Sequence, residues 1–188
     1  MSWQGIQRTI TASTEPVTVV EARTHCSLDG ADNDSILTTF ITAARMAIEN
    51  YLKRTINAST YVIAFDKFES VMSLPFPPVS AVSSVKYIDL AGVEQTLAIS
   101  EYRVDIISQP ARVSLEWNKS WPVTRSVSNA VKIEYVAGYT TCPAPVRIAI
   151  AMLTVDLFEH RGASSEISLK ENDKYRNLLS AYTMPEFF

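Results

Sequence analysis

The chain has 188 residues, of which 47% are hydrophobic and 20% charged, and its formal net charge is −3. This balance is typical of a folded protein with one domain, or with one core and a large insertion, and it excludes a disordered chain. The 17 basic residues are scattered along the sequence, which argues against tight binding to DNA, and no apolar run is long enough to span a membrane.

The chain is expected to begin with an extended arm, residues 1–16, followed by a short helix. Thr18 and Glu21 have the spacing of a capping box, in which each side chain accepts a hydrogen bond from the backbone of the other residue. This pair predicts a helix over residues 19 to about 25.

A longer amphipathic helix is expected over residues 32–53, with Asp32 or Asp34 as its N-cap. Apolar residues recur at intervals of three and four, so they share one face of the helix, and we expect this face to be buried. Polar residues take the other side. The apolar face comprises Leu37, Phe40, Ile41, Ala44, Ile48, Tyr51 and Leu52, and the polar side comprises Thr38, Thr42, Arg45, Glu49 and Lys53.

The middle of the chain, residues 60–136, is expected to form an antiparallel β-sheet or a small sandwich. Residues 82–89 and 93–99 flank a turn that contains glycine, as they do in a hairpin. Farther along, residues 112–117 and 131–135 alternate between apolar and polar side chains. This alternation predicts strands with one buried and one wet face, as in antiparallel sheets.

Two helices are expected after the sheet. Pro145 is suited to the first turn of a helix, and residues 145–161 are apolar on nearly every side. A helix of this kind is buried from several directions, so it is either the central rod of the core or it also contacts a neighbouring subunit. A more polar helix is expected over residues 170–181.

These elements predict an α+β fold in a single domain, residues 1–188. Its helical core comprises residues 17–56 and 143–182, and a β insertion covers residues 57–142. Residues 183–188 form a separate C-terminal docking segment.

The residues that often bind metals or carry out catalysis do not form a recognisable motif. His25, Cys26, Cys142 and His160 are spaced by 1, 116 and 18 residues, unlike the close pairs of structural zinc sites. No Gly-x-Ser-x-Gly sequence marks a serine nucleophile. The first residues do not resemble a signal peptide, so we expect both thiols to be reduced. We predict no catalytic residue, no metal and no cofactor.

Two parts of the sequence are candidates for contacts with other proteins. Residues 182–188 place four large apolar side chains around Pro185, which favours an extended segment docked in a groove of the chain itself or of another protein. Trp117 and Trp121 lie in an aromatic loop between two predicted strands. These tryptophans either fold back on the sheet or contact a partner.

A series of short motifs resembles the head–tail connector proteins of long-tailed bacteriophages. Residues 17–22 match the V-T-x-x-E-A start of that family, and residues 51–54 match the Y-x-x-R with which its first long helix closes. Residues 74–89 and 121–145 resemble the next two blocks, in the same order. The motifs together identify the chain as similar to this family over roughly residues 15–160.

The resemblance implies a ring of about a dozen subunits beneath the portal protein, with a bore through which DNA passes without specific binding. Tail-side completion proteins attach below such a ring, and family members reach the portal with their C-terminal segments. We therefore predict one group of residues that docks on the portal and a second that contacts the tail side or neighbouring subunits. The first group is Tyr182, Met184, Pro185, Phe187 and Phe188, and the second is Trp117 and Trp121.

We therefore expect a non-enzymatic structural protein of the virion, an adaptor that is assembled in the cytoplasm of the bacterial host and has no membrane segment. Another ring-forming virion component, such as a stopper or tail-terminator protein, is the first alternative. The second is a small cytosolic enzyme with a site built across the sheet and the helices. A concave pocket with several convergent titratable groups would indicate the enzyme.

Overall fold

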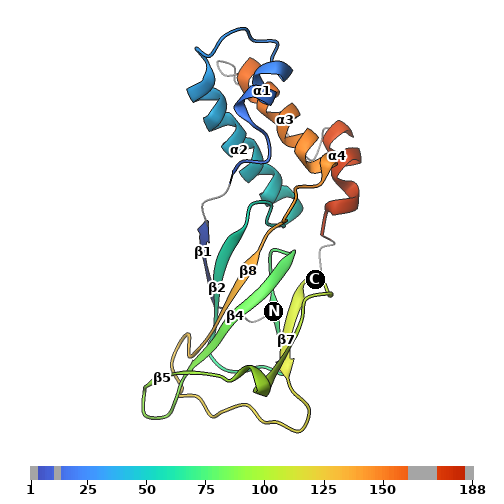
Figure 1. Ribbon diagram of the computed structural model, residues 1–188. Helices are drawn as coiled ribbons and strands as arrows, with labels where there is room; N and C mark the ends of the chain where they lie inside the picture. Colours follow the sequence, from blue (N-terminus) through green and yellow to red (C-terminus); the bar gives the residue numbers. More distant parts are fainter. Residues whose placement is uncertain (1–3, 11–13, 161–172, 185–188) are drawn as a thin grey trace. The chain divides into compact units, whose positions relative to one another are not determined.

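The computed structural model describes residues 4–10, 14–160 and 173–184, and the chain divides into two compact units. One unit consists of strands and the other of helices (Figure 1). Every strand pair is antiparallel, so the predicted α+β class is confirmed. The β unit comprises residues 1–12 and 58–138, and the helical unit comprises residues 13–57 and 139–188.

Four α-helices and a final 3-10 turn form the described part of the helical unit. The second and third helices cover most of the two ranges that the sequence predicts to be long helices. Residue 161 and residues 170–172 of the predicted helices lie outside the described part of the chain. The elements are α1 (Val19–His25), α2 (Asp34–Leu52), α3 (Ala144–Glu159), α4 (Asp173–Leu179) and η2 (Ser180–Tyr182).

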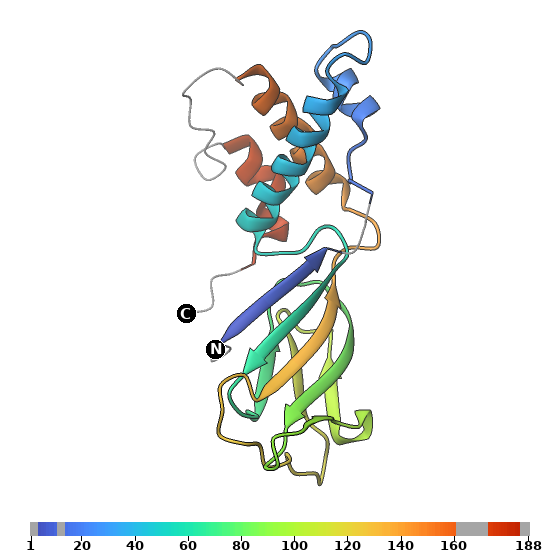
Figure 2. The ribbon, with the colours of Figure 1, turned by 90° about the vertical axis from the view of Figure 1, so that its left-hand side faces the viewer.

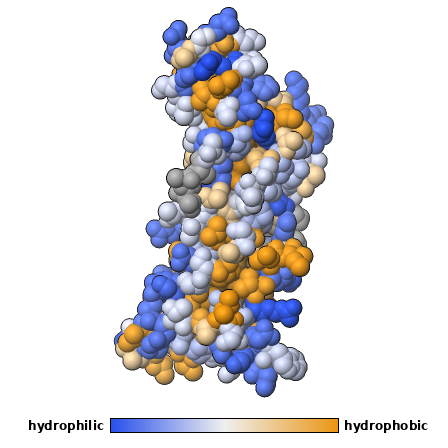
Figure 3. Space-filling model, in the orientation of Figure 1, coloured by the Kyte–Doolittle hydropathy of each residue, from blue (hydrophilic) through white to orange (hydrophobic). Residues whose placement is uncertain are grey.

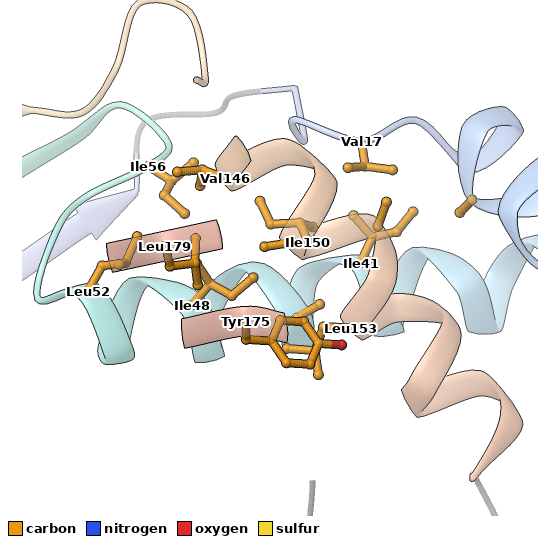
Figure 4. Close-up of a cluster of buried hydrophobic side chains, with 14 of the residues drawn as sticks. Val17, Ile41, Ile48, Leu52, Ile56, Val146, Ile150, Leu153, Tyr175 and Leu179 are labelled. Carbon is orange, nitrogen blue, oxygen red and sulfur yellow. The ribbon is translucent and has the colours of Figure 1, made fainter. Parts of the chain in front are cut away.

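The core of the helical unit lies between α2 and α3, with α1 and α4 packed against this pair. Figure 4 shows side chains from α2, α3 and α4 that point toward one another between the helices. Removal of this apolar surface from water supplies the main driving force for packing. The labelled side chains in the core include Ile41, Ile48 and Leu52 of α2, Val146, Ile150 and Leu153 of α3, and Tyr175 and Leu179 of α4.

The starts of α1 and α2 differ in how they are capped. At α1 the predicted capping box is present: the Glu21 N–H donates to the Thr18 hydroxyl at 3.2 Å, and the Thr18 N–H donates to the Glu21 carboxylate at 2.9 Å. At α2 the predicted cap is wrong, because Asn33 is the N-cap residue and no side chain caps the helix. Asp34 instead accepts two hydrogen bonds from Arg23, at 2.8 and 2.9 Å. A charge-assisted pair of this kind is stronger than a neutral cap.

Two charged residues of α2 are buried, contrary to their predicted place on the polar side of the helix. The Arg45 side chain is 3% exposed and donates to Glu15 at 2.8 Å and to Glu49 at 3.0 Å. The other oxygen of Glu49 accepts the backbone N–H of Ile56 at 2.7 Å. This network joins the segment before α1, the middle of α2 and the segment that follows α2.

Phe40, which the helical pattern places on the buried face of α2, is only half-buried. Its ring meets the ring of Phe158 edge-on, with 6.5 Å between the centroids. Ile48, two turns farther along the same face, is fully buried as predicted. The apolar face of α2 is therefore buried along the helix, with Phe40 only partly covered.

The β unit contains two antiparallel sheets, where the sequence predicts one sheet or a small sandwich. The larger sheet has the strand order β1-β2-β8-β4-β5, and the smaller has the order β3-β7-β6 (Figures 1 and 2). The predicted hairpin is present as β4 and β5. The elements are β1 (Gly5–Ile10), β2 (Ser59–Phe65), β3 (Val71–Leu74), β4 (Val79–Ile88), β5 (Glu94–Thr96), η1 (Ile99–Glu101), β6 (Tyr102–Asp105), β7 (Ala111–Leu115) and β8 (Val131–Ala137).

Both sheets contribute to one apolar core in the β unit. In β2 and β8 every second residue is buried, as their alternating sequences predict. Tyr61 of β2 stacks on Tyr135 of β8 with 5.3 Å between the ring centroids. The Tyr135 hydroxyl donates to the carbonyl oxygen of Pro75, just after β3, at 2.8 Å. The sheets are thus joined by a partly buried hydrogen bond as well as by apolar contact.

Within the predicted N-terminal arm, residues 5–10 are extended and form the edge strand β1. It pairs with β2 from Gly5↔Ala64 to Ile10↔Ser59. The β unit therefore includes residues that precede the helical unit in sequence, in addition to residues 58–138 within the predicted insertion 57–142. That the two units act as a single domain stays a prediction.

Candidate interaction surfaces

The outward side of α3 carries apolar side chains. Ile148 is 48% exposed, and Met152 and Val155, one and two turns farther along, are partly exposed. The opposite side of the helix is buried in the core through Ala149 and Ile150. The described residues therefore bury one side of α3 and cover the other only in part, with Met152 also packed against the core. We call Ile148, Met152 and Val155 the α3 stripe.

The end of the described chain is attached to the C-terminal part of α2. The Arg54 side chain donates to the carbonyl oxygen of Tyr182, and the Met184 N–H donates to the carbonyl oxygen of Leu52 at 3.4 Å. Tyr182 packs against the helical core, and Met184 is half-buried. The segment predicted to dock on the portal thus starts from a fixed point. The other predicted docking residues, Pro185, Phe187 and Phe188, lie outside the described residues.

The two tryptophans of the predicted contact loop have different surroundings. Trp121 stacks on Phe68, with 4.6 Å between the centroids and 3° between the ring planes, and packs against the β core. Trp117 is 90% exposed. Trp121 therefore folds back on its own unit, whereas Trp117 is available to a partner.

Trp117 belongs to a wider group of exposed apolar side chains that the sequence predictions missed. They lie in residues 89–101 and 116–130, at the end of the β unit where β4, β5 and η1 meet (Figures 1 and 2). Figure 3 shows apolar surface at the hairpin of β5. Apolar residues on either side of the turn glycine, Leu90 and Val93, are a sequence signal that could have found this group. We define the distal surface as Leu90, Val93, Ile99, Trp117, Val123 and Val127.

A hollow of about 450 Å³ lies beside β6 and β7, and its lining includes Arg103, Asp105 and Arg112. Asp105 accepts hydrogen bonds from the Ser108 hydroxyl at 2.6 Å and from Arg112 at 3.0 Å. The bond from Ser108 is the main reason that the pKa of Asp105 lies well below its ordinary value. The charge of this carboxylate is thus used inside its own loop, and the hollow has no group poised for proton transfer among its described lining residues.

The thiols and the other metal-binding side chains do not gather into a site in the described parts of the chain. No three of them lie close enough together to hold a metal ion among the described residues. Burial raises the pKa of the Cys142 thiol to about 11, and it also raises the pKa of Cys26. A thiol with a raised pKa is a weak nucleophile at neutral pH. Within the described residues, no helix is both long and apolar enough to cross a membrane.

Comparison with known proteins identifies the relatives of this chain. The model of the head completion protein family matches residues 15–186. Among solved structures, a chain from the neck of an empty gene transfer agent particle, computed with C6 symmetry, has a TM-score of 0.74 and 19% identity, with 97% of each chain covered. A chain from the virion of the native gene transfer agent particle has a TM-score of 0.75 and 19% identity, with 96% of this chain and 97% of that chain covered.

A third structure, the neck of the native gene transfer agent particle computed with C12 symmetry, gives a TM-score of 0.73 at 19% identity, with 97% of each chain covered. At this level of identity these likenesses show that the fold is shared. No curated protein matches the chain.

Proposed function

The chain belongs to the head completion protein family and is a structural component of the head–tail connection, and we propose that it forms an adaptor ring between the portal and the tail of a long-tailed bacteriophage or prophage. The family match over residues 15–186 carries this proposal, because it includes elements of both units. The role is non-enzymatic and needs no cofactor. The protein is assembled in the cytoplasm of the bacterial host and becomes part of the virion.

A ring requires each subunit to offer two different surfaces to its two neighbours. The α3 stripe supports one such contact, because Ile148 is exposed and Met152 and Val155 are only partly buried on a helix whose other side lies in the core. The similar chains come from particle necks computed with C6 and C12 symmetry, which supports a ring of about a dozen subunits here.

DNA passes through the bore of this ring without specific binding. The net charge of −3 and the scattered basic residues support such a conduit, because clustered basic residues would hold the phosphate backbone and slow its passage. Tail-side completion proteins attach on the side of the ring opposite the portal.

The C-terminal segment docks on the portal. Its start is held at the C-terminal end of α2 by the bonds from Arg54 and from the Met184 N–H. Two phenylalanines, Phe187 and Phe188, can each contribute about 1.5–3 kcal/mol when buried, and repetition around a ring adds avidity.

The test compares the intact chain with a chain that ends at Met184. This truncation keeps the described contacts of Tyr182 and Met184, so the free energy of unfolding is expected to change by less than about 1 kcal/mol. Co-sedimentation with purified portal complexes is expected to be lost. The full-length double variant Phe187→Ser/Phe188→Ser removes the two aromatic side chains without shortening the chain. It is expected to lose co-sedimentation with the portal as the truncated chain does.

Two results would contradict portal docking by this segment. If the truncated chain unfolds, the segment belongs to the core of the helical unit. If both the truncated chain and the double variant still sediment with the portal, the anchor lies elsewhere in the chain.

A further inference from the structure

We infer that the distal surface of the β unit is where the tail-side partner binds, and that this partner offers apolar side chains surrounded by basic residues. The inference rests on the proposed adaptor function and specifies which face of the chain carries one of its two attachments. It concerns residues 89–101 and 116–130 together with the neighbouring loop 66–70.

The three loops meet at one end of the β unit because of the strand register. Tyr87 pairs with Val131, so the end of β4 lies beside the start of β8, and Tyr102 pairs with Leu115, so the start of β6 lies beside the end of β7. Phe68 contacts both Tyr87 at the end of β4 and Trp121 in the loop that follows β7. Backbone bonds continue the contact beyond the strands, from the Glu116 N–H to the Glu101 carbonyl oxygen at 3.1 Å and from the Arg125 N–H to the Ile88 carbonyl oxygen at 3.0 Å.

The chain enters and leaves the β unit at its other end. There β2 begins at Ser59 and β8 ends at Ala137, and these two residues are paired. The loops of the distal surface are therefore the part of the β unit farthest along its strands from the connections to the rest of the chain. The segments that connect the β unit to the rest of the chain therefore do not occupy this end of the strands.

The distal surface gathers six of the large apolar side chains that are exposed in the described part of the chain. Single exposed apolar residues are ordinary on a protein surface, whereas a contiguous group indicates an interface. Six exposed apolar residues lie in two loops here, and one of them is Trp117, a residue type that dominates binding energy at interfaces. The hydrogen bond between the Glu116 and Glu101 backbones brings the segments that carry Trp117 and Ile99 together at one end of the small sheet.

The loops that carry this surface are internally fixed. The Asp89 carboxylate accepts the Val93 N–H at 2.9 Å and the Gln95 side-chain amide at 2.8 Å, and these bonds lower the pKa of Asp89, so the carboxylate stays charged. Gly92 has φ +87°, and a Cβ atom at this position would lie 2.4 Å from the guanidinium of Arg125. The two loops thus pack closely at Gly92. A surface that is already ordered loses little entropy when a partner binds.

The charges around the distal surface favour a different protein over a second copy of this chain. The three loops carry an excess of carboxylates after the paired residues are set aside, because Glu94 pairs with Lys86 and Lys132 on the sheet and Glu101 pairs with Lys119. Two acidic copies placed face to face would repel each other, whereas a basic rim on a partner would be attracted. The remaining charged residues of the loops are Asp66, Glu69, Asp89 and Glu116, with Lys67 and Arg125 as the cations.

The experiment follows two attachments of the full-length chain separately. Purified, DNA-filled heads that carry the portal are incubated with the chain and sedimented, and purified tails are then added and the fraction of tailed heads is counted by electron microscopy. The test variant is the double substitution Ile99→Ser/Trp117→Ser. The control is Ile107→Ser, because Ile107 is 91% exposed in the loop at the opposite end of β6. Thermal melting checks that both variants fold.

The double variant is expected to bind heads as the unchanged chain does and to reduce tail joining by at least about tenfold. Ile107→Ser is expected to leave both attachments unchanged. Raising the salt concentration from about 0.05 to about 0.5 M is expected to weaken tail joining by the unchanged chain, because it screens the acidic rim. Tail joining that is insensitive to salt would overturn the basic partner.

Two other outcomes would overturn the distal surface as the tail-side site. One is tail joining by the double variant within about twofold of the unchanged chain, which would show that Ile99 and Trp117 contribute little. The other is loss of head binding by the double variant, which would assign the surface to the portal or to a neighbouring subunit. If the unchanged chain itself binds neither heads nor tails, the proposed adaptor function fails, and this result is distinct from both.

Discussion

Arg45 is the residue whose surroundings matter most for the helical unit. Its guanidinium lies between the carboxylates of Glu15 and Glu49, and both of its ion pairs are largely shielded from water. Glu49 also accepts the N–H of Ile56, so the backbone after α2 depends on the same carboxylate. Removing one member of a buried network leaves the others charged and without a full set of partners, which is the costly case for buried ion pairs.

We expect Arg45→Ala to destabilise the helical unit by about 3–5 kcal/mol. The measurement is urea denaturation followed by the helical circular dichroism signal. Arg176→Ala is the matched control, because Arg176 pairs with Asp173 on the surface, where both side chains are more than half exposed. The control is expected to cost less than about 1 kcal/mol. Equal effects of the two substitutions would show that the Arg45 network is not buried in solution.

At the scale of single residues, the sequence alone did not predict which of these side chains are buried. Arg45 and Glu49 follow the polar side of the helical pattern, and only their partners, Glu15 and the backbone after α2, explain why they are buried. Likewise, Trp117 and Trp121 are four residues apart, and no local pattern distinguishes them. Trp121 is covered because Phe68, distant in sequence, stacks on it.

At the scale of elements, α3 shows why an apolar sequence alone does not define what covers a helix. Residues on nearly every side are apolar, yet the neighbouring helices bury one side, and on the α3 stripe Ile148 is exposed while Met152 and Val155 are only partly buried. In the proposed ring, a neighbouring subunit would cover this stripe. The two sides of α3 should therefore differ in their effect on the isolated chain.

We expect Ile150→Ala to destabilise the helical unit by about 2–5 kcal/mol, because Ile150 is fully buried and its removal creates a cavity. Ile148→Ala, on the exposed stripe, is expected to change the stability of the monomer by no more than about 0.5 kcal/mol. Chemical denaturation at a concentration where the chain is monomeric provides the comparison. A large loss for Ile148→Ala would show that the stripe is covered within one chain.

The capping box of α1 makes a pH-dependent contribution. The pKa of Glu21 lies below its ordinary value of 4.5, chiefly because the Thr18 N–H donates to the carboxylate, with further help from the Thr18 hydroxyl and Arg147. A carboxylate with a lowered pKa in the folded state stabilises that state above its unfolded pKa. This contribution is complete above pH 4.5 and is lost as the pH falls through the lower pKa of the folded state.

We therefore expect Glu21→Gln to lose less stability than the unchanged chain between about pH 5 and pH 3. Urea denaturation at several pH values measures the difference. At neutral pH, Thr18→Ala is expected to cost about 1 kcal/mol through loss of the cap. Parallel pH profiles for Glu21→Gln and the unchanged chain would contradict the role of Glu21.

The elements themselves could largely be predicted, because each has a strong local pattern. The capping box marks the start of α1, intervals of three and four mark α2, and alternation marks β2 and β8. The number of sheets was harder to predict from the sequence, because it depends on which strands pair when they are far apart along the chain. The pairing of β1 with β2 joins Gly5 to Ala64 and places the N-terminal arm in the β unit.

At the scale of the whole molecule, the family match extends across helices that come before and after the β insertion. This continuity explains how a resemblance made of short motifs could identify the family, since the motifs lie in both units and keep their order. The interaction surfaces were harder to predict, because exposure is a property of the folded units. The C-terminal segment is marked in the sequence by its apolar composition, and its docking on the portal stays a prediction.

The most direct test of the adaptor function is electron microscopy of the full-length protein mixed with its cognate portal complex. We expect added density on one side of the portal, in the form of a closed ring with rotational symmetry, an open bore, and both units of the chain present in each repeat. A portal that shows no added density, or one that binds separate copies of the chain without a ring, would contradict the account.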